Sequence, residues 1–107
     1  MSGRITIFGY GPVGRATAER LSVAGREALV AQRSKPAALP KGAAFVTADA
    51  LDRESVLSAT RGSAEIVVAI GFPYEGRLWR ELWPKTIGNF VAACEATGAR
   101  MVFVDNL

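Results

Sequence analysis

The residues best suited to bind a ligand are three glycines near the start of the chain, in a G-x-G-x-x-G pattern. The first glycine allows a tight turn, the second lets a pyrophosphate approach the backbone, and the third lets a helix pack closely on a strand. The proline in the pattern suits the first turn of a helix, and free N–H groups there face a ligand's phosphates. The pattern predicts a dinucleotide site at Gly9, Tyr10, Gly11, Pro12, Val13 and Gly14. The alternative is a tight strand-to-helix turn with no ligand.

A second group of polar residues lies about 20 positions further along the chain. An acidic residue there would hold the ribose 2′-hydroxyl of NAD, but the sequence reads Gln32-Arg33-Ser34-Lys35. The guanidinium of Arg33 can pair with a 2′-phosphate and lie over the adenine ring, and Ser34 can add a hydroxyl. This segment favours NADP, with NAD as the second choice. The alternative is a solvated basic loop.

Several kinds of chemistry are excluded by composition. The chain contains no histidine and a single cysteine, Cys94, which rules out triads with a histidine base, structural zinc and an internal disulfide. The net charge is +3, and the basic residues are scattered rather than gathered in a stripe with aromatics. A nucleic-acid surface is therefore not expected, although a positive balance suits an anionic ligand. We expect no metal site.

The length and hydropathy of the chain indicate one compact domain. Its 107 residues suffice for a single core, and 50% of them are hydrophobic. No apolar run approaches the roughly 18 residues that a membrane span needs. Together with the lone cysteine, this predicts a cytoplasmic protein.

The order of elements predicts a parallel α/β sheet. Continuous apolar runs indicate strands, and runs with helical spacing that end at glycine indicate helices. Strands are predicted at 4–8, 28–31, 44–47, 66–70 and 101–104, and helices at 12–24, 53–61 and 84–97. The Pro-rich stretch between the second and third strands predicts an irregular connection. Strands that are apolar on both faces are typical of a doubly wound Rossmann sheet, here in the order 3-2-1-4-5.

Two further stretches carry a family resemblance. Residues 47–57 resemble the third-strand-to-helix junction of extended and atypical short-chain dehydrogenases/reductases. Residues 66–71 and 89–104 are similar to the fourth and fifth strands and the intervening helix of the NAD-dependent epimerase/dehydratase branch. The resemblance covers nearly the whole chain, but only the cofactor half of that family's fold.

The resemblance implies further residues of the cofactor site. Asp49 would accept a hydrogen bond from the adenine amino group, with the backbone of Ala50 beside it. Gly71 and Phe72 would border the ribose and the nicotinamide. The family's turn is usually G-x-x-G-x-x-G, and Phe8 stands here in place of its first glycine. The alternatives are that Asp49 merely solvates a strand end and that residues 71–73 are only a loop.

The family's catalytic residues are missing. Its chemistry needs a tyrosine with a lysine four positions later, and none of the three lysines follows a tyrosine at that spacing. The usual Ser or Thr after the fifth strand is replaced by Asp105-Asn106, so no catalytic residue is predicted. We therefore expect this chain to be a fragment of a longer protein. The rest of that protein would supply the catalytic residues and cover the exposed edge of the sheet.

Three functions remain open. The chain is predicted to be the NADP-binding domain of an oxidoreductase or epimerase/dehydratase, with the parent's enzymatic activity uncertain. A non-catalytic NADP-dependent redox sensor is the alternative, and an assembly module without cofactor is the third. Cys94 is expected in the core, and Trp79 and Trp83 are expected to pack on the sheet or another subunit rather than to wall a pocket. The exposed edge and the last helix favour a homodimer.

Overall fold

The computed structural model describes residues 3–70 and 76–104, in which a single parallel sheet is flanked by helices. The strands are β1 (Arg4–Phe8), β2 (Ala28–Gln32), β3 (Ala43–Thr47), β4 (Ser63–Val68) and β5 (Arg100–Phe103). The helices are α1 (Pro12–Val23), α2 (Arg53–Thr60) and α3 (Gly76–Thr97). The sheet order is β3-β2-β1-β4-β5, and every pairing is parallel. The predicted α/β Rossmann fold and its strand order are confirmed.

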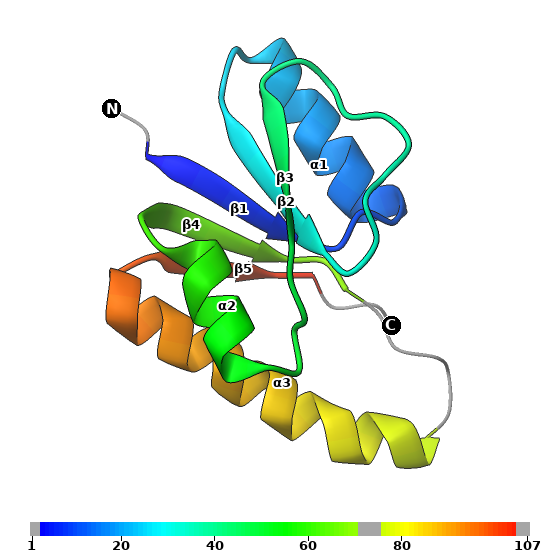
Figure 1. Cartoon of the computed structure of the whole chain (residues 1–107), viewed down its shortest axis with the longest axis vertical. Coiled ribbons are helices and arrows are strands. Elements are labelled where there is room, and N and C mark those ends of the chain that lie inside the picture. Colours follow the sequence, from blue (N-terminus) through cyan, green and yellow to red (C-terminus); the bar gives the residue numbers. More distant parts are fainter. Residues whose placement is uncertain (1–2, 71–75, 105–107) are drawn as a thin grey trace.

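The helices divide between the two faces of the sheet, and each face has its own core (Figure 1). On the first face, Ile5 and Ile7 of β1 pack with Ala18 of α1. On the second face, Phe8 packs against α2 and α3 and meets the ring of Phe90 edge to face, with centroids 4.8 Å apart. Alternate residues of β1 are buried on opposite faces, so this central strand is apolar on both sides except for Thr6, whose buried hydroxyl bonds to that of Ser63.

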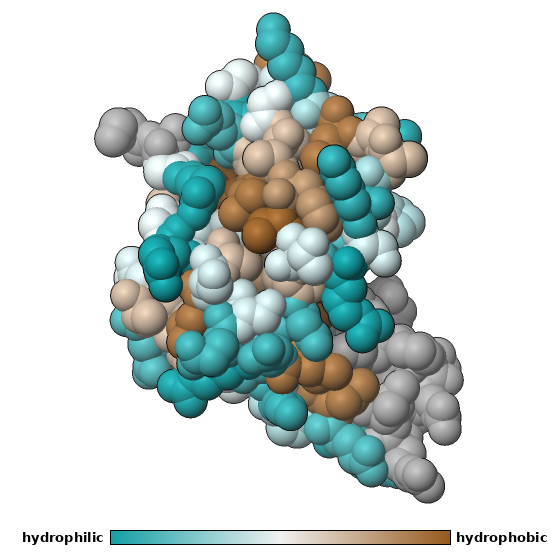
Figure 2. All heavy atoms as spheres, viewed as in Figure 1, coloured by the Kyte–Doolittle hydropathy of each residue, from teal (hydrophilic) through white to brown (hydrophobic). Residues whose placement is uncertain are grey.

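The connection from β2 to β3 is irregular, as the sequence predicts. Residues 33–42 contain no helix and end at Gly42, whose φ of +86° suits glycine. The edge strand β3 that follows leaves Phe45 and Val46 only half-buried. Figure 2 shows hydrophobic side chains gathered over this strand, bordered by hydrophilic ones.

The start of α3 differs from the prediction. The sequence placed Pro84 at the first turn, but the helix begins at Gly76 and contains Pro84 in its interior. An interior proline removes one backbone hydrogen bond, yet Pro84 is exposed, so water can satisfy the freed carbonyl. The ring of Trp83 packs edge to face on Phe103 of β5, with centroids 5.3 Å apart, and this contact favours continuing the helix past the proline.

The bounds of β4 also differ, because polar residues at its start take part in the sheet. The prediction began at Ile66, whereas the strand begins at Ser63 and ends at Val68. The Ser63 hydroxyl lies 2.5 Å from that of Thr6, and Glu65 forms an ion pair with Arg100 of β5. Hydrophobicity alone does not reveal such pairs. No helix in residues 3–70 and 76–104 is long and apolar enough to cross a membrane.

Candidate functional site

The candidate site lies where three neighbouring strands end. Phe8 of β1 pairs with Ala31 of β2, and Gln32 of β2 pairs with Thr47 of β3. The three following segments therefore meet at one edge of the sheet: the glycine turn 9–14, the residues after β2, and the residues after β3. The carboxyl edge of an open parallel sheet is where such folds bind ligands. Gly71 and Phe72, also expected here, lie outside the described residues.

Each glycine of the turn occupies a distinct environment. Gly9 has a φ of +102°, and an added Cβ would lie 2.5 Å from the carbonyl oxygen of Ala69. An added Cβ on Gly14 would lie 2.0 Å from the carbonyl oxygen of Gly9, so helix and turn can approach only without a side chain. At Gly11 an added Cβ meets nothing within 4 Å. Gly9 and Gly14 are therefore required by the fold, whereas Gly11 leaves an open space next to the backbone.

The turn leaves three backbone donors at the start of α1. Gly11 is the N-cap, and the first helical hydrogen bond runs from Arg15 N to Gly11 O at 2.8 Å. The N–H groups before Arg15 have no helical acceptor, and Pro12 has no N–H. Gly11, Val13 and Gly14 thus present their N–H groups at the positive end of the helix dipole, an arrangement that suits phosphate oxygens.

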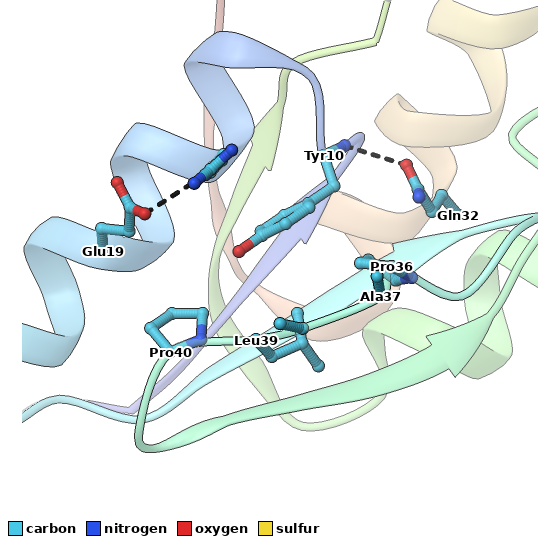
Figure 3. Close-up of a pocket in the computed structure, with 9 residues that line it drawn as sticks. Tyr10, Glu19, Gln32, Pro36, Ala37, Leu39 and Pro40 are labelled. Atoms are coloured by element: carbon cyan, nitrogen blue, oxygen red, sulfur yellow. Dashed lines mark hydrogen bonds and ion pairs between the residues drawn. The ribbon is translucent and has the colours of Figure 1, made fainter.

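Gln32 is a site residue that the sequence analysis did not single out. Its Oε1 accepts a hydrogen bond from the backbone N–H of Tyr10 at 2.9 Å (Figure 3). Its Nε2 donates to the carbonyl of Ser34 at 2.7 Å. One amide therefore joins the glycine turn to the segment after β2. The sequence does show Gln32 as a polar residue at the end of an apolar strand. Its bond to Tyr10, however, depends on the pairing of β1 with β2.

Arg33 and Ser34 are exposed at the end of β2. Among the described residues, no carboxylate forms an ion pair with the Arg33 guanidinium. The side chain is therefore available to an anionic ligand at this edge. The structure places Arg33 and Ser34 next to the glycine turn, because Gln32 contacts both segments.

Asp49 and Ala50 lie in the turn between β3 and α2. The Asp49 carboxylate accepts a hydrogen bond from Leu51 N at 3.0 Å, and its own N–H donates to Ser55 Oγ at 2.9 Å. One carboxylate oxygen of Asp49 thus stabilises its own turn. The Ala50 carbonyl accepts from the side chain of Asn89 at 2.9 Å.

Asn89 is the second residue that the sequence analysis did not assign to the site. Its side chain is only 6% exposed, and it connects α3 to the turn after β3. A buried amide on an apolar helix face needs a partner, which is the signal that was present in the sequence. The partner itself, 39 residues away, could be found only from the fold.

The remaining candidate residues are structural in the described part of the chain. Cys94 packs half-buried against the second-face core, as expected, and this burial raises the pKa of its thiol. Trp83 packs on β5, again as expected. Within the ranges 3–70 and 76–104, no cluster of three or more Cys, Asp or Glu side chains could hold a metal ion.

No protein-family model and no curated protein sequence matches the chain. Solved structures do resemble it. Uronate dehydrogenase from Agrobacterium tumefaciens is 25% identical with a TM-score of 0.76, over 96% of this chain and 40% of that enzyme. A Rossmann-fold NAD(P)-binding family protein from Shigella flexneri is 18% identical with a TM-score of 0.79, over 100% of this chain and 53% of that protein.

A third similar structure is glucuronic acid dehydrogenase from Chromohalobacter salexigens, 20% identical with a TM-score of 0.78, over 99% of this chain and 41% of that enzyme. The chain therefore spans about half or less of each of these proteins. The glycine turn, the strand order and these likenesses describe an α/β Rossmann-like domain whose similarities are consistent with the NAD-dependent epimerase/dehydratase branch.

Proposed function

We propose that this chain binds NADP(H) and is the cofactor domain of a short-chain-dehydrogenase-like oxidoreductase or epimerase/dehydratase. The observation that supports this best is the open space at Gly11 beside the backbone donors of Gly11, Val13 and Gly14. A pyrophosphate placed there would accept from those donors and lie at the N-terminus of α1. A variant of the similar uronate dehydrogenase is complexed with NAD, which supports a dinucleotide as the ligand.

The preference for NADP rests on the end of β2. Discrimination between the two cofactors requires contacts to the 2′-substituent, because both share the pyrophosphate. Gln32 ends the strand without a negative charge, and its amide is already bonded to Tyr10 and Ser34. The exposed guanidinium of Arg33 follows it directly. This combination suits a phosphate better than a free hydroxyl.

The chemical step is assigned to other parts of a longer parent protein. No Tyr-x-x-x-Lys pair occurs in these 107 residues, and the similar solved enzymes are more than twice as long as the matched region. When bound, the dinucleotide supplies hydride transfer, and this chain's residues bind and orient its adenosine and pyrophosphate.

The test is a calorimetric titration of the purified chain with NADP and with NAD. We expect both to bind, with NADP tighter by about tenfold or more, as one or two charge-assisted hydrogen bonds would give. Absence of binding by either dinucleotide would contradict the proposal and favour an assembly module. Equal affinities would retain the dinucleotide site but contradict the choice of NADP.

A further inference from the structure

A cavity of about 530 Å³ lies between α1 and the loop that follows β2. Its size falls within the range of small-molecule sites, about 300–1,000 Å³. One wall is polar and consists of Arg15, Glu19 and Gln32, and the other is the apolar segment 36–40. Figure 3 shows the Tyr10 ring extending from the glycine turn into this space.

The cavity is continuous with the candidate dinucleotide site. Tyr10 belongs to the glycine turn and Gln32 closes β2, and both residues also line the cavity. An adenosine bound across the ends of β1 and β2 would therefore place its ribose at the mouth of the cavity. The 2′-substituent of that ribose is the part of the cofactor that differs between NADP and NAD.

Arg15 supplies the cationic group of the cavity wall. Its Nε lies 3.2 Å from the Glu19 carboxylate, and the two side chains are 67% and 54% exposed. An ion pair this exposed contributes little net free energy, so a doubly charged phosphate can compete for the guanidinium. Arg33 and Lys35, which directly precede the apolar wall in the chain, are also exposed and add positive charge to this loop.

We propose that Arg15 is a second specificity-determining residue, which leaves Glu19 and pairs with the 2′-phosphate of NADP at this cavity. The inference rests on the proposed function and adds to it. Arg33 and Arg15 would then contact the phosphate from opposite sides, one from the end of β2 and one from the first turns of α1. Glu19 holds Arg15 when the site is empty and opposes the phosphate by its charge.

The experiment compares four proteins: the wild type, Arg15→Gln, Glu19→Gln and the matched control Arg20→Gln. Arg20 is also exposed on α1, but it does not line the cavity. Each protein is titrated with NADP, NAD, 2′,5′-ADP and 5′-AMP, after circular dichroism has shown unchanged folding. The adenosine fragments isolate the 2′-phosphate from the nicotinamide half.

We expect Arg15→Gln to weaken NADP and 2′,5′-ADP by about three- to tenfold, and to leave NAD and 5′-AMP unchanged. Glu19→Gln should strengthen the two phosphorylated ligands and leave the others unchanged. Arg20→Gln should alter none of the four. The inference is overturned if Arg15→Gln weakens NAD equally, changes nothing, or has no more effect than Arg20→Gln. A wild type that binds no dinucleotide overturns the proposed function as well, so the two failures are distinguishable.

Discussion

The backbone N–H of Tyr10 and the side-chain oxygen of Gln32 are joined by a hydrogen bond of 2.9 Å, which links the turn after β1 to the end of β2. The same amide also donates to the carbonyl of Ser34. Gln32 therefore joins the glycine turn to the segment that carries Arg33. Two substitutions separate the role of its hydrogen bonds from the role of its neutrality.

Gln32→Leu removes both hydrogen bonds at nearly constant volume. We expect the free energy of unfolding to fall by about 1–2 kcal/mol, and both dinucleotides to bind more weakly because the turn is no longer held. Gln32→Glu keeps an acceptor for Tyr10 but adds a negative charge, so NADP should weaken more than NAD. Urea unfolding and calorimetry measure the two effects. An equal loss of both cofactors in Gln32→Glu would contradict the placement of the 2′-phosphate here.

Gly11→Val tests the phosphate site without disturbing the core. Its Cβ would meet nothing within 4 Å, so the fold should lose only about 1 kcal/mol from a poorer helix cap. The side chain would occupy the pyrophosphate position, and NADP and NAD should both weaken by about tenfold or more. The control is Gly14→Ala, whose Cβ would lie 2.0 Å from the Gly9 carbonyl and should instead destabilise the protein. Normal binding by folded Gly11→Val would disprove the site.

Arg33→Ala tests the choice of cofactor. Removing the guanidinium should weaken NADP by roughly one to two decades and leave NAD nearly unchanged, because only NADP carries the 2′-phosphate. Lys41→Ala, in the same loop and also exposed, is the matched control and should have a much smaller effect. Titration calorimetry at fixed ionic strength gives the affinities. If Arg33→Ala lost both cofactors equally, Arg33 would not contact the 2′-phosphate.

Asn89→Leu tests the connection between α3 and the turn after β3. The Ala50 carbonyl would lose the 2.9 Å hydrogen bond that it accepts from Asn89, a residue that is only 6% exposed. We expect a loss of about 1–3 kcal/mol in the free energy of unfolding, measured with urea. Val91→Ala on the exposed side of the same helix should change it by only about 0.5 kcal/mol. Similar values for both variants would mean that the Asn89 bond contributes nothing.

We further expect the isolated chain to associate with itself, as the exposed sheet edge predicts. In the described sheet β5 pairs only with β4, and Val102 and Phe103 of this edge strand are 42% and 39% exposed. An edge strand with exposed apolar residues favours pairing with another chain. Sedimentation velocity at about tens of micromolar should show a dimer that Val102→Lys weakens. A monomer throughout that range would contradict this expectation.

The sequence was sufficient for the architecture because its strands are buried on both faces. The apolar runs around Ile7 and Val67 and the glycine pattern between the first strand and helix determine the order of elements locally. The prediction that Pro84 begins the last helix is wrong because a solvent-facing proline is tolerated inside a helix. The residue before it, Trp83, packs on β5 and supports the helix there. That contact joins residues far apart in the sequence, so no local pattern reveals it.

The site could be predicted only where a single segment defines it. The turn at 9–14 is such a segment, and the close contacts at Gly9 and Gly14 agree with the reasons given for the first and third glycines. The roles of Gln32 and Asn89 depend on partners 22 and 39 residues away. Asp49 is expected at the site from the family resemblance, whereas its bond to Leu51 depends on the turn that forms there. The hydrogen-bond partner of a polar side chain depends on which segments the fold brings together. The contacts of Gln32 and Asn89 could therefore be found only from the structure.

The proline inside α3 divides the helix into parts of unequal protection against hydrogen exchange. Pro84 has no amide proton, so the ladder of helical bonds is interrupted at the carbonyl of Arg80. Beyond this point Phe90 and Ala93 are fully buried, and their amides can exchange only when much of the fold opens. Just before Pro84, Arg80 and Glu81 are exposed and Leu82 is only half-buried, so we expect the amides of this part to exchange faster. The helix therefore combines a buried part that supports the sheet with a more exposed part for which we expect lower protection.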